Sequence, residues 1–154
     1  MADRLRPSND LEERPLRVLV IDDHELNRRV MQAVLAEFGC SVTLAASGEE
    51  AAGHVAAQAF DLIVADFHMP HMDGDETVRR IRGGGLCREA FVARWSTGAP
   101  GRLDAGLYDA ELPKPINCAA LADVVADARR WAVNRADVGA PPRLGRASGA
   151  PRQT

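Results

Sequence analysis

Short apolar segments alternate with longer amphipathic ones through most of this chain of 154 residues. Residues 16–21 and 62–65 are almost entirely apolar and have the length of strands that are buried on both faces. Between them, residues 25–38 carry apolar side chains at helical spacing, and Gly39 follows as a residue that readily takes the left-handed conformation of a helix end. This alternation is typical of βα units around a parallel sheet. We therefore expect an α/β fold.

The remaining elements follow from the same patterns and from their end signals. Ser47 and Glu50 have the spacing of a capping box, and Asn117 is a good helix cap before the last amphipathic segment. Three glycines after residue 82 end another helix. We expect further strands at 41–45, 91–95 and 110–112, and further helices at 47–59, 75–82 and from residue 117 onward.

Composition and charge exclude several classes of function. The formal net charge is −3 at pH 7, which gives no electrostatic reason to expect strong nonspecific binding to nucleic acid. No apolar run approaches the roughly 18–20 residues of a membrane span, and the first residues have no signal-peptide pattern. The spacing of Cys40, Cys87 and Cys118 fits neither a metal knuckle nor a disulfide framework. We expect a cytoplasmic protein with reduced thiols and no nucleic-acid or membrane partner within this chain.

The two ends of the chain differ from its middle. Residues 1–15 mix charges of both signs with prolines, and residues 135–154 alternate Pro, Gly, Ala and Arg without any apolar period. We expect a flexible leader at 1–15, one domain at 16–134 and a disordered tail or linker at 135–154.

Carboxylates follow two of the expected buried strands. Asp22 and Asp23 follow the first strand, and Asp66 follows the third. Right-handed crossovers place these two strands side by side with their carboxyl ends on one edge of the sheet. Two such charges at 4 Å repel by about 4 kcal/mol at an effective dielectric constant near 20. Either Mg²⁺ or Lys114, the single lysine of the chain, would balance this charge.

Three segments together resemble the receiver domain of two-component response regulators: VLVIDDHELNRR at 18–29, DLIVADFHMPHMDG at 61–74 and LPKPI at 112–116. The resemblance covers about residues 16–134. It implies a flavodoxin-like (CheY-like), doubly wound, five-stranded parallel sheet in the order 2-1-3-4-5. It also implies that an aspartate takes a phosphoryl group from a histidine kinase or a histidine phosphotransfer protein.

The resemblance assigns roles to individual residues. Asp66 matches the phosphorylated aspartate, and Lys114 matches the lysine that contacts the phosphoryl group. The peptide bond before Pro115 is expected to be cis. Mg²⁺, or Mn²⁺ in its place, would be held by the following ligands: Asp22, Asp23, Asp66 and the backbone carbonyl of His68.

The switch hydroxyl of the family stands at the end of the fourth strand, where this chain offers two candidates. The WSTG string at 95–98 resembles the Phe-Ala-Thr-Gly element of atypical FATGUY-type receivers and favours Thr97. Counting thirty residues from Asp66, the spacing seen in the family, leads to Ser96 instead. We take Thr97 as the first candidate and Ser96 as the alternative.

The segment between Thr97 and Lys114 departs from the family. It is short and contains prolines and glycines, so we expect a shortened or irregular fourth helix. The family's switch aromatic stands three residues before the lysine, where this chain has Glu111; Tyr108 lies six residues before it. We therefore expect the output to be ordering of residues 97–111 rather than an aromatic flip.

We predict a phosphoacceptor that relays a two-component signal to a downstream protein target, as a stand-alone regulator or as the receiver of a hybrid histidine kinase. It would catalyse only its own phosphorylation and dephosphorylation, and would not be an enzyme acting on a metabolite. The alternative is a phosphorylation-independent interaction module with a receiver fold. A metal-dependent phosphohydrolase would need a second acid two residues after Asp66, where the chain has His68.

Overall fold

The computed structural model describes residues 14–66, 74–83, 85–97 and 107–138. In these residues five parallel strands form one sheet in the order β2-β1-β3-β4-β5, which confirms the predicted fold class and strand order. The bounds of each strand lie within one residue of those expected. The strands are β1 (Arg17–Ile21), β2 (Ser41–Ala45), β3 (Leu62–Asp66), β4 (Phe91–Ser96) and β5 (Ala110–Pro113).

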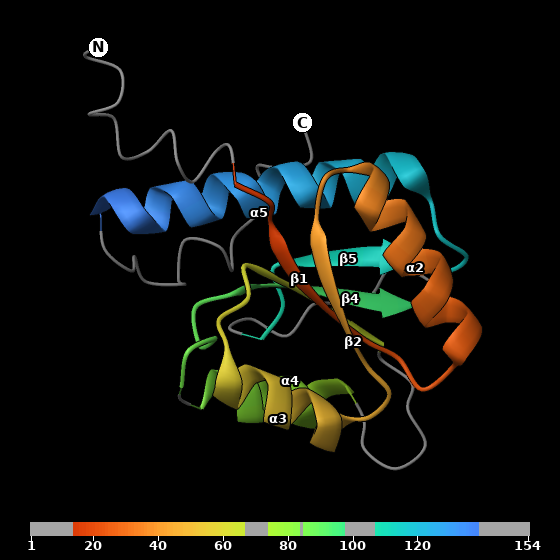
Figure 1. Ribbon diagram of the computed structural model, residues 1–154, viewed down its shortest axis with the longest axis horizontal. Helices are drawn as coiled ribbons and strands as arrows, with labels where there is room; N and C mark the ends of the chain where they lie inside the picture. Colours follow the sequence, from red (N-terminus) through yellow and green to blue (C-terminus); the bar gives the residue numbers. More distant parts are fainter. Residues whose placement is uncertain (1–13, 67–73, 84, 98–106, 139–154) are drawn as a thin grey trace.

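Helices cover both faces of the sheet (Figure 1). One face carries α2 (Glu25–Glu37) and α5 (Cys118–Val138), and the other carries α3 (Gly48–Ala57) and α4 (Gly74–Arg82). The last helix, α5, continues four residues past the expected end of the domain at residue 134. Among the described residues, none of the helices has both the length and the apolar character needed to cross a membrane.

The two central strands explain why the core has two halves. Successive side chains of a strand point to opposite faces, so Val18 and Val20 of β1 join the core under α2 and α5. Leu19 and Ile21 join the core under α3 and α4. Burial on both faces is the reason that β1 and β3 are continuous apolar runs in the sequence.

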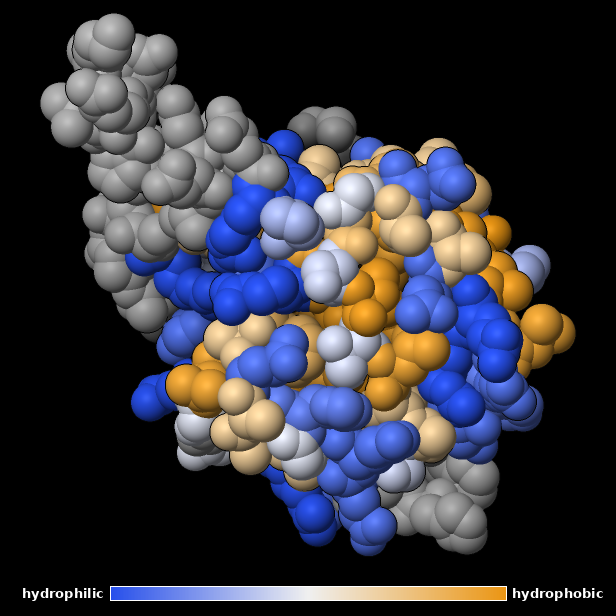
Figure 2. Space-filling view, in the orientation of Figure 1, coloured by the Kyte–Doolittle hydropathy of each residue, from blue (hydrophilic) through white to orange (hydrophobic). Residues whose placement is uncertain are grey.

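β2 forms one edge of the sheet and is less covered than the central strands. Its apolar residues Val42 and Leu44 are half-buried and pack against the core on the side of α2. In Figure 2 apolar surface lies in the middle of the view, where β2 runs in Figure 1, with hydrophilic residues around it.

The helix ends follow the signals expected from the sequence. The Ser47 hydroxyl accepts a hydrogen bond from the Glu50 backbone N–H (3.1 Å), and the Asn117 side chain accepts one from the Ala120 N–H (3.0 Å). Gly39, directly after α2 and its cap, has a φ angle of +80°, a conformation that side chains other than glycine adopt only with strain.

Some expectations concern residues outside the described ranges. The expected shortened fourth helix falls on residues 98–106, and most of the leader (1–13) and the tail (139–154) also lie outside. The carbonyl of His68 lies outside as well. Cys40, Cys87 and Cys118 are all described, and all three are free thiols.

Candidate phosphoacceptor and cation site

The carboxylates that follow β1 and β3 lie together at one edge of the sheet. Ile21 of β1 stands beside Ala65 of β3 in parallel register, so the next residues, Asp22 and Asp66, become neighbours. Both are almost fully buried, with 0% and 1% of their surface exposed. One ligand atom each from Asp22, Asp23, His24 and Asp66 lies within 4.8 Å of all the others. The expected convergence of carboxylates is present.

Lys114 lies between these carboxylates. Its Nζ is 2.9 Å from Asp66 Oδ1 and 3.3 Å from Asp22 Oδ2. The backbone N–H of Lys114 donates to the carbonyl of Ser96 (3.0 Å), which fixes the start of the side chain against the end of β4. The peptide bond between Lys114 and Pro115 is cis. Because it contacts both Asp22 and Asp66, the Lys114 ammonium offsets part of the repulsion between these two buried acids.

Asp22 is held by the first turn of α2. Its Oδ1 accepts from the His24 backbone N–H (2.8 Å), and its Oδ2 accepts from the Asn27 side-chain amide (3.2 Å). The Arg28 guanidinium donates to the Asp22 carbonyl (2.8 Å). These bonds explain how the DDHELNR sequence turns from a strand directly into a helix while keeping one carboxylate aimed at the site.

Asp23 provides the test of whether the site suits a cation. Its Oδ1 is buried and accepts no hydrogen bond from the described residues, although His24 Nδ1 lies 3.1 Å away. A buried carboxylate oxygen without a donor is costly, and a hard divalent cation would satisfy it. Oxygen ligands from several carboxylates are what Mg²⁺ prefers, so the residues present fit this ion.

His24 belongs to this cluster, although no motif in the sequence predicts a role for it. Its side chain is 70% exposed, and imidazole nitrogen suits transition metals rather than Mg²⁺. The signal that could have revealed it is its position two residues after Asp22, in the turn that the carboxylate of Asp22 itself caps.

The two candidate switch hydroxyls differ in burial. Ser96 is the last residue of β4 and is 6% exposed, whereas Thr97 follows the strand and is exposed. Ser96 also stands one residue past Trp95, the register partner of Asp66. Ser96 is thus the buried hydroxyl of the two, and its backbone carbonyl accepts a hydrogen bond from the Lys114 N–H. Which of the two is the switch hydroxyl stays a prediction.

A charged pair occupies the place of the family's switch aromatic. Glu111 of β5 stands beside Arg94 of β4, and the Arg94 guanidinium donates to Glu111 Oε2 (2.8 Å). The Arg94 guanidinium also lies 5.7 Å from the ring centre of Tyr108. Tyr108 is buried, and its hydroxyl donates to Asp75 Oδ1 in the first turn of α4 (2.7 Å). Tyr108 therefore connects the start of β5 to α4.

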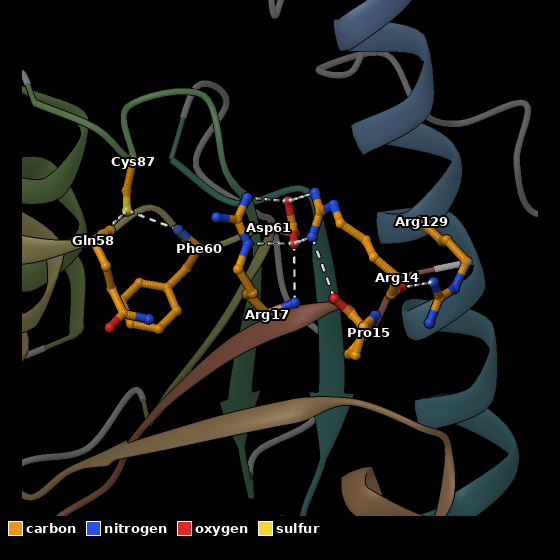
Figure 3. A network of polar contacts seen from close by, with 8 residues as sticks. All are labelled: Arg14, Pro15, Arg17, Gln58, Phe60, Asp61, Cys87 and Arg129. Carbon is orange, nitrogen blue, oxygen red and sulfur yellow. Dashed lines mark hydrogen bonds and ion pairs between the residues drawn. The ribbon is translucent and has the colours of Figure 1, made fainter. Parts of the chain in front are cut away.

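A third buried carboxylate, Asp61, lies just before β3, at the end of the sheet where the strands begin (Figure 3). Arg14 donates to both of its carboxylate oxygens (2.9 and 3.0 Å), and Arg17 donates through its backbone N–H (2.9 Å) and its guanidinium. Burial raises the pKa of Asp61, but the bonds from the two arginines outweigh it and lower the pKa from 3.8 to about 2. Arg14, assigned by sequence to the leader, is thus bound to the domain.

The thiol of Cys87 packs near this network. Its Sγ accepts from the Phe60 backbone N–H (3.3 Å) and contacts the Gln58 carbonyl (3.5 Å). Burial raises the pKa of this thiol, which keeps it protonated near neutral pH. Cys87 is a buried residue of the core under α3 and α4.

Comparison with known proteins identifies the family. Residues 18–126 match the family model described as the response regulator receiver domain. The chain belongs to the response regulator receiver family. Receiver domains are phosphoacceptors of two-component signalling, and they partner with histidine kinases or phosphotransfer proteins. In the structure of this receiver domain, Asp22, Asp23 and Asp66 lie close together, and Lys114 contacts Asp22 and Asp66.

Relatives of the receiver domain include both regulators and sensor kinases. The chain is 45% identical over 94 residues to the two-component response regulator ORR41 of Oryza sativa subsp. japonica, covering 58% of this chain and 73% of that protein. It is 32% identical over 127 residues to the sensor histidine kinase RcsC of Salmonella typhi, covering 80% of this chain but only 13% of the kinase.

Solved structures share the fold of the receiver domain. The chemotaxis response regulator CheY4 of Vibrio cholerae superposes with a TM-score of 0.68 at 26% identity, covering 74% of this chain and 98% of that one. The family and the fold are thereby established.

Proposed function

We propose that this receiver domain takes a phosphoryl group onto Asp66 from a histidine kinase or a histidine phosphotransfer protein, in a Mg²⁺-dependent reaction, and so relays a two-component signal. The observation that carries the proposal is the meeting of Asp22, Asp66 and Lys114 at the carboxyl edge of the sheet. This edge is where ligands bind in doubly wound α/β folds.

The residues present can perform the transfer. An Asp66 carboxylate oxygen attacks the phosphorus, a new O–P bond forms, and the bond from phosphorus to the donor histidine nitrogen breaks with its electron pair staying on that nitrogen. Lys114, 2.9 Å from Asp66 Oδ1, is within reach of a phosphoryl oxygen on that carboxylate. Its ammonium would stabilise the charge that develops on the phosphoryl oxygens.

Asp22, Asp23 and Asp66 would hold the metal ion, with the carbonyl of His68 as the further ligand expected from the family. When bound, the ion supplies positive charge to the phosphoryl oxygens and to the carboxylates around it. The buried Oδ1 of Asp23, which accepts no hydrogen bond from the described residues, supports this assignment.

The surface beside the site offers a place for the phosphoryl donor. Leu26 and Val30 of α2 are exposed apolar residues, with 73% and 41% of their surface accessible, and α2 begins directly after the acid pair. Exposed apolar residues next to a reactive group are typical of protein contact surfaces. We infer that the histidine-bearing partner docks against α2.

The test uses the full chain with Mg²⁺ and a small phosphodonor, followed by intact-protein mass measurement. The wild-type protein should gain one phosphoryl group, and Asp66→Asn should gain none. Asp75→Asn is the matched control, because its amide oxygen still accepts from Tyr108 and lies outside the acid cluster. A wild-type protein that stays unmodified would refute the proposal.

A second candidate function is a phosphorylation-independent interaction module. The observation that favours it is the Arg94–Glu111 ion pair, which stands at the place of the switch aromatic. This pair connects β4 to β5 and does not involve Asp66. Under this alternative, the affinity for a downstream partner would be the same for wild type, for Asp66→Asn and in the presence of beryllofluoride.

A further inference from the structure

Lys114 follows β5, a strand that is not a neighbour of β3, the strand that carries Asp66. The sheet order places β4 between β3, which carries Asp66, and β5, which precedes Lys114. The residue of β4 beside Asp66 is Trp95, and on its other side Trp95 stands beside Leu112. The lysine side chain must therefore pass over the end of β4, where Trp95 lies.

The ammonium of Lys114 lies against the face of this tryptophan. Nζ is 4.7 Å from the centre of the Trp95 ring, while the same atom contacts Asp66 and Asp22. An ammonium within about 6 Å of an indole centre is attracted by the negative face of the ring. Lys114 thus has three neighbours that attract it, of which one is uncharged.

Packing alone holds the Trp95 ring in this orientation. Trp95 is 2% exposed and belongs to the core cluster under α2 and α5. Its Nε1 is buried and makes no hydrogen bond within the described part of the chain. A buried indole N–H without an acceptor is unfavourable, and a purely apolar side chain would fill the space without that cost. The ring fills the core, but its N–H carries a cost that an apolar side chain of similar size would not.

We propose that Trp95 is a positioning residue for Lys114. The face of its ring keeps the ammonium next to the Asp22 and Asp66 carboxylates, where it can contact the phosphoryl group. This inference rests on the proposed function of Asp66. Phosphorylation converts the Asp66 carboxylate into an acyl phosphate, so the negative charge that Lys114 faces moves from the carboxylate to the phosphoryl oxygens, whereas the ring is unchanged by the reaction. The ring keeps the flexible four-carbon stem from leaving the site at that moment.

The first experiment is a mutant cycle on beryllofluoride binding in Mg²⁺, measured by calorimetry. Trp95→Met removes the aromatic face but keeps an apolar side chain, and Trp95→Phe keeps a face. We expect Trp95→Met to weaken binding about five- to tenfold and Trp95→Phe about twofold or less. In a Lys114→Met background, Trp95→Met should have no further effect, because no ammonium remains to be held.

The chain offers a matched control in its second tryptophan. Trp131 of α5 is also buried, but its Nε1 donates to the Glu89 carbonyl (2.7 Å). It lies in the second half of α5, whereas Lys114 precedes that helix. Trp131→Met should therefore leave beryllofluoride affinity unchanged. Equal weakening by Trp131→Met, or weakening by Trp95→Met that persists in the Lys114→Met background, would overturn the inference.

A second measurement needs no substitution at position 95. Because Lys114 is the single lysine of the chain, selective ¹³C-lysine labelling gives one set of side-chain NMR signals. The ring current of Trp95 should shift the ε-methylene signals upfield, both without and with beryllofluoride. Unshifted signals would overturn the inference. A wild-type protein that binds no beryllofluoride would overturn the proposed function instead, so the two failures are distinguishable.

Discussion

Replacing Asp61 by asparagine should destabilise the protein strongly near neutral pH and less in acid. Asp61 is fully buried, and its two oxygens accept five hydrogen bonds from Arg14 and Arg17. Burial by itself raises the pKa of Asp61, and the two arginines lower it further than burial raises it, to about 2 against 3.8 for an ordinary aspartate. The folded state therefore holds the ionised form more tightly than the unfolded state does.

The size of the effect follows from this difference in pKa. A difference of nearly two units corresponds to about 2 kcal/mol of the free energy of unfolding. Because the folded pKa is the lower one, this stabilisation is present in full above about pH 5 and is lost as the pH falls towards 2. By pH 3 about half of it, roughly 1 kcal/mol, should be gone.

Urea unfolding followed by tryptophan fluorescence measures the free energy of unfolding of wild type and of Asp61→Asn at pH 7 and at pH 3. The difference in the free energy of unfolding between wild type and Asp61→Asn should shrink by about 1 kcal/mol from pH 7 to pH 3. Glu25→Gln is the control, because Glu25 forms an exposed ion pair with Arg29 whose loss should cost at most about 0.5 kcal/mol. A deficit of Asp61→Asn that is the same at both pH values would refute the reasoning.

Three further predictions concern the acid site at the carboxyl ends of the strands. Ser96→Ala should slow phosphorylation by a small phosphodonor about tenfold or more, and Thr97→Ala about twofold or less, because Ser96 is the buried hydroxyl; rates measured by intact mass in the reverse order would select Thr97. Lys114→Met in EDTA should lower the free energy of unfolding by about 3 kcal/mol, because two buried carboxylates lose their ammonium. Mg²⁺ should then raise Tm more in this variant than in wild type. Equal rises would contradict the claim that Mg²⁺ binds among the carboxylates that Lys114 contacts. Leu26→Ser should slow transfer from a phosphorylated histidine partner about fivefold while leaving phosphorylation by the small donor unchanged; equal effects on both would exclude α2 as the docking surface.

The fold could be predicted from the sequence because its central strands carry a strong signal. β1 and β3 are buried on both faces, so they are short apolar runs, and amphipathic segments with clear caps lie between them. The placement of the acids could also be predicted, because Asp22 and Asp66 directly follow strands whose ends share an edge.

Contacts across the sheet could not be predicted in the same way. The meeting of Trp95 with Lys114 and of Arg94 with Glu111 depends on the register between β4 and β5, which a local pattern of apolar residues does not specify. Arg14 was assigned to the leader because its neighbours are charged and prolines surround it. Its partner Asp61 lies 47 residues away in the sequence, and only the folded chain brings them together.

The charges at the two ends of β3 differ: those at its start suit a structural role, and those at its end suit the proposed reaction. At the start of the strand, one carboxylate meets two guanidinium groups, so its charge is more than balanced and its pKa is low. At its end, Asp66 lies with Asp22 and Asp23. Among the described residues, one ammonium and one exposed histidine contact their carboxylates, and the Arg28 guanidinium binds the Asp22 backbone carbonyl. Stability alone would favour balance at both ends, because unbalanced buried charge is costly. The deficit at the carboxyl edge therefore supports the view that a divalent cation completes this site, and that the cation together with Lys114 carries enough positive charge to receive a phosphoryl group there.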